Sequence, residues 1–186
     1  MRLSVISLVS IGLAILAGCA TQPNVPDAVH SELVAPYQLD SGDQLRVIVF
    51  GQDDISNTYV VDQAGAVTLP LIGTIPARGH TTSEIAANIE THLRNGYLRR
   101  PNVSVQVDKY RPFFAMGEVG VAGQYAFVPG MTVQQAIAVA GGFSPRADTA
   151  SVSVTRSIGG RVESGTLSLS DPVEPGDTIT VRERLI

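Results

Sequence analysis

Alternating apolar and polar positions predict a protein built mainly from short β-strands. Residues 45–50 and 103–108 place apolar side chains at every second position, the pattern of a half-buried strand. Between these segments, Ile85, Ile89 and Leu93 recur at four-residue spacing, which indicates the buried face of a helix. Gly96 gives this helix a stop signal. The first half of the chain therefore reads as strands, one helix and a further strand.

The remaining elements are shorter. Residues 58–61 and 67–69 flank the turn at 62–65, and this arrangement predicts a β-hairpin. In the second half, strands are expected at 113–116, 124–128, 178–182 and around 152–154. A short strand is expected at 167–169. A helix begins at Thr132 and ends at Gly141-Gly142.

Two short sequence patterns occur in both halves of the chain. The segment 39–47 (LDSGDQLRV) is echoed by 173–181 (VEPGDTITV), so that Gly42-Asp43 and Gly176-Asp177 each open an alternating strand. An Asp at such a turn can accept hydrogen bonds from nearby backbone N–H groups, which favours a structural role over a ligand role for both carboxylates. The echo leaves open whether the halves share an ancestor or only the same turn chemistry.

A second echo marks the start of each helix. The spacing Gly-x-Thr-x-x-Glu/Gln occurs at 79–84 and again at 130–135, and it predicts a capping box at Thr81 and at Thr132. Strands covered on one face by a helix define an α+β fold class. We expect two domains, at 37–110 and 111–186.

The N-terminus resembles a bacterial lipoprotein leader. Arg2 precedes an apolar stretch at 5–16, which is shorter than the roughly 20 residues of a membrane span. It ends in Leu16-Ala17-Gly18-Cys19, and Cys19 is the single cysteine of the chain. The resemblance to a lipobox implies cleavage after residue 18 and acylation of Cys19, followed by a tether over 19–36. The alternative is a buried Cys in an ordinary exported or core segment.

Charge and composition give little support to nucleic-acid binding, metal binding or catalysis. The formal net charge is −4 without a basic patch, which argues against nucleic acid as a partner. The three histidines are His30, His80 and His92, and none has a second ligand at metal spacing. No nucleophile or phosphate-loop motif occurs, so we expect no catalytic residue, no metal and no cofactor.

Two pairs of adjacent charged residues are candidate functional sites. Asp53-Asp54 follows Gly51 in an expected loop, where a solvated turn is favoured over acid–base chemistry. Arg99-Arg100 precedes Pro101 and could face a phosphate or an acidic sugar, although a solvated pair of loop charges is the default.

Several motifs in order resemble the outer-membrane polysaccharide export family. The family phrase Tyr-x-Leu-x-x-Gly-Asp-x-Leu-x-Val-x-Val-Phe matches residues 37–50. Val-Asp-x-x-Gly at 61–65, Leu-Pro-x-Ile-Gly at 69–73 and Gly-x-Thr at 79–81 follow, then Gly-Glu-Val at 117–119 and Ala-Gly-Gly at 140–142. The last segment resembles a β-grasp (SLBB) module. The residues that carry the motifs are Gly42, Asp43, Gly73, Gly79, Gly117, Gly141, Gly142, Gly176 and Asp177.

This resemblance implies a role in export and no enzymatic activity. Copies of the chain would form a homo-oligomeric ring whose lumen passes capsular polysaccharide or exopolysaccharide. The ring would dock on an inner-membrane polysaccharide co-polymerase. The residue after Cys19 is Ala20 and not Asp, which in lipoproteins of this kind implies the periplasmic face of the outer membrane. The alternatives are a monomeric carbohydrate-binding lipoprotein and a cell-wall-modifying enzyme.

The chain departs from the family pattern in two places. The family usually has Pro before the glycine where this chain has Val121-Ala122-Gly123. Long members also carry further β-grasp modules and a C-terminal amphipathic helix that lines a pore, whereas this sequence stops at Ile186. We therefore expect a separate outer-membrane β-barrel protein to complete the export path.

The leader predicts the behaviour of a single variant. Cys19→Ser removes the thiol that would be acylated, and we expect it to abolish lipid labelling and to release processed protein from the membrane. Growth with a radioactive fatty acid, followed by immunoprecipitation, measures this. Equal labelling of the variant and the wild type would contradict the lipid anchor.

Overall fold

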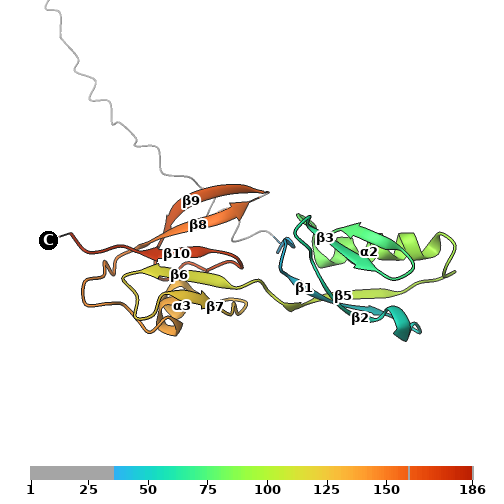
Figure 1. Cartoon of the computed structure of the whole chain (residues 1–186), viewed down its shortest axis with the longest axis horizontal. Coiled ribbons are helices and arrows are strands. Elements are labelled where there is room, and N and C mark those ends of the chain that lie inside the picture. Colours follow the sequence, from blue (N-terminus) through green and yellow to red (C-terminus); the bar gives the residue numbers. More distant parts are fainter. Residues whose placement is uncertain (1–35, 159, 186) are drawn as a thin grey trace, which may run out of the picture.

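A computed structural model describes residues 36–158 and 160–185, which form two lobes placed end to end (Figure 1). Each lobe has its own hydrophobic core. The core of the N-terminal lobe is built from residues between Leu39 and Val105, and that of the C-terminal lobe from residues between Phe113 and Val181. The chain passes between them through the short segment at 110–112.

The N-terminal lobe is organised around an antiparallel sheet. Its strands are β1 (Gln44–Val49), β2 (Asn57–Val60) and β5 (Val103–Lys109), in the order β2-β1-β5. Alternation in β1 points Leu45, Val47 and Val49 into the core, where each is at most 1% exposed. The short 3-10 helix η2 (Asp53–Ile55) connects β1 to β2 and buries Ile55.

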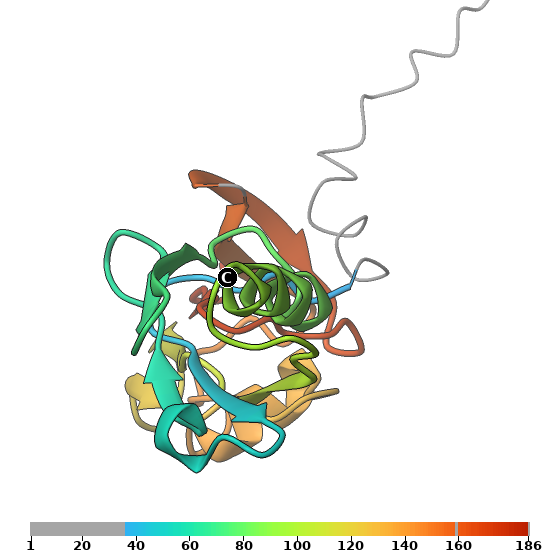
Figure 2. The same cartoon turned by 90° about the vertical axis from the view of Figure 1, so that its right-hand side faces the viewer.

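A helix and a hairpin complete this core. Strands β3 (Ala66–Leu69) and β4 (Gly73–Pro76) form a separate two-stranded sheet, and α2 (Thr82–Arg94) follows. The helix buries Ile85, Ile89 and Leu93 completely, so the predicted apolar stripe is confirmed. Figure 2 views the molecule along its length from this end, with α2 seen nearly down its axis.

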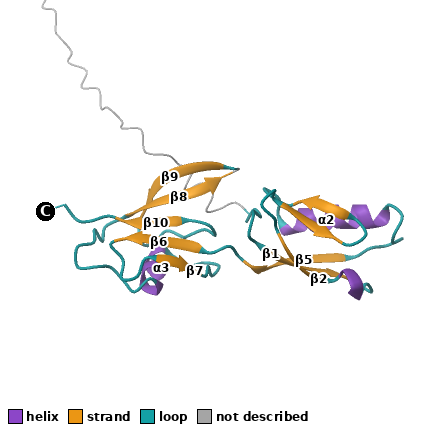
Figure 3. Ribbon diagram, viewed as in Figure 1, coloured by secondary structure: helices purple, strands orange, loops and turns teal. Residues whose placement is uncertain are grey.

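The C-terminal lobe is a five-stranded sheet covered on one face by α3 (Val133–Val139) (Figure 3). Its strands lie in the order β7-β6-β10-β8-β9. They are β6 (Phe113–Gly117), β7 (Gly123–Tyr125), β8 (Val152–Ile158), β9 (Arg161–Leu167) and β10 (Thr178–Val181). β10 lies in the middle, parallel to β6 and antiparallel to β8. The last strand of the chain therefore closes the core of this lobe.

Both predicted capping boxes are confirmed. The Thr81 backbone N–H donates to Oε2 of Glu84 at 2.8 Å, and the Glu84 N–H donates to Oγ1 of Thr81 at 3.3 Å. Thr132 and Gln135 repeat the arrangement at the start of α3, at 3.0 and 3.4 Å. Each box provides partners for backbone N–H groups that the helix itself leaves unpaired.

The predicted hairpin across residues 62–65 is wrong. The turn exists, because the Gly65 N–H donates to the Asp62 carbonyl at 2.9 Å, but the strands on either side of it belong to different sheets. β2 pairs with β1, and β3 pairs with β4. The Gly65 carbonyl accepts from the N–H groups of Ala77 and Arg78, just after β4, and this directs the chain toward β4.

Three other elements differ from the sequence prediction. The strand expected at 124–128 is shorter, since β7 ends at Tyr125. The short strand expected at 167–169 is the end of the seven-residue β9, which pairs with β8 along its whole length. β9 contains Gly, Ser and two charged residues and buries little on either face, so its apolar pattern is weak. The loop expected at Asp53-Asp54 is η2, with both carboxylates exposed.

Among the described residues, no helix has the length and apolar character needed to cross a bilayer.

The buried stripe of α2 sets the stability of the N-terminal lobe. Ile89→Ala would leave a cavity at a position with 0% exposure, and we expect it to lower the free energy of unfolding by about 2–5 kcal/mol. Thr91→Ala, on the exposed face of the same helix, is the matched control and should change it by less than about 0.5 kcal/mol. Chemical denaturation followed by circular dichroism measures both. Equal losses would show that α2 is not packed as described.

Candidate functional site

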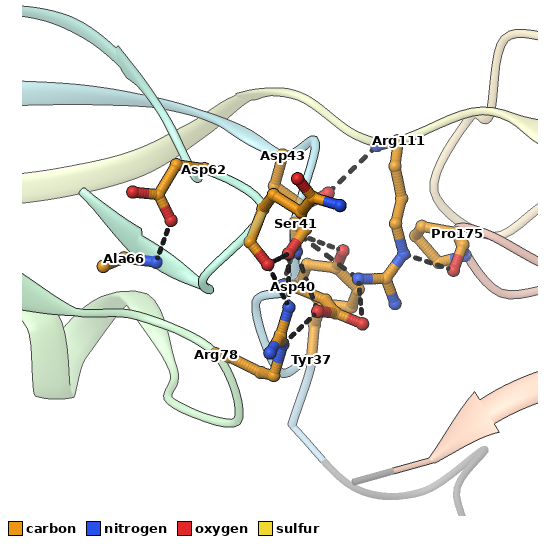
Figure 4. A network of polar contacts seen from close by, with 10 residues as sticks. Tyr37, Asp40, Ser41, Asp43, Asp62, Ala66, Arg78, Arg111 and Pro175 are labelled. Carbon is orange, nitrogen blue, oxygen red and sulfur yellow. Dashed lines mark hydrogen bonds and ion pairs between the residues drawn. The ribbon is translucent and has the colours of Figure 1, made fainter. Parts of the chain in front are cut away.

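The two Gly-Asp turns, which are more than a hundred residues apart in sequence, meet at the joint between the lobes (Figure 4). Gly42-Asp43 precedes β1 and Gly176-Asp177 precedes β10. Arg111, in the connecting segment, contacts both turns. This joint brings polar groups from segments far apart in the sequence into one hydrogen-bonded cluster.

Asp43 is fully buried and its carboxylate is surrounded by donors. Oδ2 accepts the Tyr37 hydroxyl at 2.6 Å and the Asp40 N–H at 3.0 Å. Oδ1 accepts the backbone N–H of Arg111 at 2.9 Å. A buried carboxylate needs such partners because its desolvation is costly. Asp43 therefore ties the N-terminal lobe to the connecting segment.

Asp177 repeats this arrangement in the C-terminal lobe. Its Oδ2 accepts the Glu174 N–H at 2.8 Å, the counterpart of the bond between Asp43 and Asp40. Its charge is met by Arg156, whose Nε and Nη2 donate to the two carboxylate oxygens at 2.8 and 2.7 Å. The two side chains are 4% and 0% exposed, so this is a buried, bidentate ion pair.

Arg111 spans the space between the turns. Its Nε donates to the Pro175 carbonyl at 2.9 Å, within the second turn. Its Nη1 lies 3.3 Å from Oδ2 of Asp40 and 3.8 Å from Oδ2 of Asp43, within the first turn. One guanidinium thus joins the lobes, a task for which its planar set of several donors is suited.

Aromatic rings extend the joint. Tyr37 of the N-terminal lobe meets Tyr110 of the connecting segment edge-on, with ring centroids 5.1 Å apart. Tyr110 meets Phe127 of the C-terminal lobe in the same way, at 5.4 Å. Burial raises the pKa of the Tyr37 hydroxyl well above its usual range, and its hydrogen bond to the Asp43 carboxylate adds to this. Tyr37 therefore stays protonated and keeps donating to Asp43.

A second arginine braces the first turn from the β4–α2 connection. Arg78 donates from Nε to Oδ1 of Asp40 at 2.8 Å and from Nη2 to the Ser41 hydroxyl at 2.6 Å. Burial would raise the pKa of Asp40, but these bonds and the Ser41 N–H hold it below its usual value. Asp40 is thus ionised and shared between Arg78 and Arg111.

A groove between the lobes runs beside these residues, with Tyr37, Gly79, Ser157 and Glu174 among its walls. The guanidinium groups on it, those of Arg78, Arg111 and Arg156, all have carboxylate partners. The groove therefore belongs to the structural joint. Among the buried side-chain polar atoms of the described residues, Nη1 of Arg111 alone lacks a hydrogen bond, although it is ion-paired with Asp40.

The structure separates the remaining motif glycines. Gly42, Gly79 and Gly176 lie at the joint, as do Asp43 and Asp177. Gly73 begins β4 in the N-terminal lobe, Gly117 ends β6, and Gly141 and Gly142 follow α3. Gly117 leaves no room for a side chain, since a Cβ would overlap the Val181 carbonyl of β10. Cys19, His30 and the tether lie outside the described residues.

Sequence reasoning missed the cations of the joint. Arg111 and Arg156 did not stand out in sequence, because neither belongs to a motif and Arg156 sits in a strand of otherwise uncharged residues. Tyr37 is the first residue of the family motif at 37–50, but nothing in that motif indicates that its hydroxyl donates to Asp43. A signal existed for Arg111 alone, as a charged residue at the expected boundary between two domains.

No catalytic or metal constellation appears in the described part of the chain. No group of three or more His, Cys, Asp or Glu side chains lies within reach of one metal ion there. Nδ1 of His80, a partly exposed residue just before α2, lies 3.6 Å from Oε2 of Glu84. On the exposed surface of α2, the His92 Nδ1 lies 2.8 Å from the Asn88 carbonyl. Arg99 and Arg100 are exposed.

Comparison with known proteins identifies two domain profiles in this chain. The profile described as polysaccharide biosynthesis/export protein matches residues 31–108, and the SLBB domain profile matches residues 116–165. The chain therefore carries a polysaccharide biosynthesis/export domain followed by an SLBB domain. The first match contains Gly42-Asp43, whereas the second ends within β9, before Gly176-Asp177 and β10.

Two curated relatives carry names from polysaccharide transport. The chain is 40% identical over 124 residues to the exopolysaccharide production protein ExoF of Rhizobium meliloti (strain 1021), covering 60% of this chain and 29% of that protein. It is 28% identical over 161 residues to the polysialic acid transport protein KpsD of Escherichia coli, covering 80% of this chain and 28% of that protein. The chain thus spans less than a third of the length of these relatives. These matches agree with the expectation that the protein is not an enzyme.

The joint predicts different costs for two glycine substitutions. Gly176 has φ +87°, and a Cβ there would lie 2.6 Å from Nε of Arg111. Gly130→Ala is the matched control, since Gly130 has φ +81° but open space around its Cβ. We expect Gly130→Ala to lower the free energy of unfolding by about 1–2 kcal/mol, from backbone strain alone. Gly176→Ala should cost more, because it also displaces Arg111.

Thermal melts and the NMR signal of the Arg111 Nε–H measure the difference. The signal should shift in the Gly176 variant and stay in place in the Gly130 variant. Equal melting temperatures with an unchanged Arg111 signal would contradict the close approach at the joint.

Proposed function

We propose that the protein is a component of a capsular-polysaccharide or exopolysaccharide export complex, held by lipid at Cys19 on the periplasmic face of the outer membrane. The observation that carries the proposal is the succession of the export and SLBB matches along one chain. The names of the relatives, exopolysaccharide production and polysialic acid transport, support the same process.

In this proposal, copies of the chain assemble into a ring through which the polysaccharide passes. A ring of identical copies needs a heterologous interface whose rotation closes, and closure requires every copy to hold the same shape. Arg111 supports this requirement, because it bonds to both turns and so links the two lobes. Strands β2, β5, β7 and β9 lie at sheet edges and offer backbone groups for contacts between copies.

The ring docks on an inner-membrane polysaccharide co-polymerase and hands the polysaccharide to an outer-membrane partner. A protein without catalytic groups contributes to such a pathway by position and contact. The lipid would hold one end of the assembly at the outer membrane, while the two lobes reach into the periplasm.

Deletion of the gene tests the proposal. We expect surface and secreted polysaccharide to fall, and the wild-type gene on a plasmid to restore it. Arg111→Ala should restore it poorly, because the lobes lose their fixed angle, while Arg99→Ala, an exposed arginine of the N-terminal lobe, should restore it fully. Immunoblots control for protein level.

Unchanged polysaccharide in the deletion strain would contradict the export role itself. Full restoration by Arg111→Ala would contradict only the need for a fixed angle. A ring should also appear as a high mass when the full chain, solubilised in detergent, is examined by light scattering, whereas a monomeric mass would favour a carbohydrate-binding lipoprotein.

A further inference from the structure

The open face of the five-stranded sheet carries an ordered array of side-chain hydroxyls. The opposite face is covered by α3 and forms the core of the C-terminal lobe. On the open face, three adjacent strands each contribute two hydroxyl residues whose positions are in register. They are Thr178 and Thr180 on β10, Ser153 and Thr155 on β8, and Ser164 and Thr166 on β9. Ser157 of β8 lies on the same face but pairs with Val162.

The register aligns these residues in two rows across the sheet. Thr178 is paired with Thr155, and Thr155 with Ser164; Thr180 is paired with Ser153, and Ser153 with Thr166. Neighbouring strands lie about 4.8 Å apart, and residues two positions along a strand about 6.7 Å apart. The result is a nearly regular grid of hydroxyl groups on a single surface.

The grid is accessible and largely without internal partners. Ser164 and Thr166 are exposed, and the other four residues are partly exposed. Thr155 and Ser164 lie 3.4 Å apart through their hydroxyls. Within the described part of the chain, the hydroxyls of Ser153, Thr166, Thr178 and Thr180 make no hydrogen bond. Each hydroxyl can both donate and accept, so these groups are available to a ligand.

Apolar and amide side chains flank the grid on the side of β6. Phe114 pairs with Thr178, and Met116 with Thr180, and they are 39% and 51% exposed. Gln124 on β7 extends the first row beyond Phe114. None of these side chains is charged. Of the charged residues next to β10, Asp177 before the strand is fully buried and Arg182 directly follows its end.

The open sheet face of the N-terminal lobe has a different chemistry. Its central strand presents Arg46 and Ile48, and Arg46 lies 3.5 Å from Asp108 of β5. Phe50, directly after β1, is 62% exposed. This face therefore combines an ion pair with exposed apolar side chains. The two faces are therefore not equivalent, and the uncharged hydroxyl grid belongs to the C-terminal lobe alone.

We propose that the hydroxyl grid is a contact surface for the polysaccharide, which it binds through hydroxyl–hydroxyl hydrogen bonds and not through charge. A sugar ring has hydroxyl groups at its rim and apolar C–H groups on its faces, so the grid can meet the rim while Phe114 and Met116 meet a face. Flexible, individually weak contacts also suit passage, since a path must bind its cargo without trapping it. The choice of a polysaccharide as the occupant rests on the proposed function.

The test uses the full chain in detergent and isosteric substitutions. The grid variant combines Thr155→Val, Thr178→Val and Thr180→Val, which remove hydroxyls but keep shape and strand propensity. The matched control combines Thr58→Val, Thr68→Val and Thr74→Val, three strand threonines of the N-terminal lobe. The probes are maltoheptaose, cellohexaose and fragments of the polysaccharide secreted by the source strain.

We expect at least one probe to bind, with NMR shifts confined to β6, β8, β9 and β10. The grid variant should bind it at least about tenfold more weakly, and the control as tightly as wild type. Affinity should change little between low and high salt, because the contacts do not involve charge. NMR mapping on the unmodified protein gives a result even if the grid variant folds poorly.

Three results would overturn the inference: no binding of any probe, shifts that map to other surfaces, or equal binding by the grid variant and wild type. A grid variant that binds sugar normally but changes oligomeric mass would assign the face to protein contact instead. These results are independent of the gene-deletion phenotype, so failure of the grid and failure of the export role are distinguishable.

Discussion

The arrangement of this protein depends on one cation between two acidic turns. Each lobe has its own core and is closed by its own strands and helix, so apolar burial stabilises the lobes without setting the angle between them. Arg111 connects the lobes, because its backbone N–H donates to Asp43 and its guanidinium contacts Asp40 and Pro175. Charge-assisted hydrogen bonds add geometric specificity, so even a small polar joint restrains how the two lobes lie.

The joint also explains why the Gly-Asp phrase occurs twice. In each lobe the turn starts a strand that its core requires, β1 in one and β10 in the other. The two carboxylates, however, have different partners for their negative charge. Asp177 has the buried guanidinium of Arg156, whereas Asp43 combines neutral donors with a more distant Arg111. The same local motif thus closes one lobe internally and connects the other lobe to its neighbour.

The match to the polysaccharide biosynthesis/export profile gives these features a functional setting. The family match alone does not divide the surface into regions. The structure does, because it separates a mixed charged and apolar sheet face in the N-terminal lobe from an uncharged hydroxyl face in the C-terminal lobe. Part of that second face lies on β10, beyond the end of the SLBB match at residue 165.

The sequence by itself determined the elements that depend on neighbouring residues. The strand at 45–50, the stripe of α2 and both capping boxes followed from local periodicity and side-chain chemistry, which act over a few residues. Only the tertiary structure decided which strands pair. The hairpin predicted across 62–65 therefore does not form, and no local pattern indicates the central place of β10. The alternation of apolar and polar residues shows which residues of a strand share a face, but not which other strand pairs with that strand. For the same reason the meeting of the two turns at Arg111, and the alignment of hydroxyls across three strands, arise from long-range packing that no local pattern encodes.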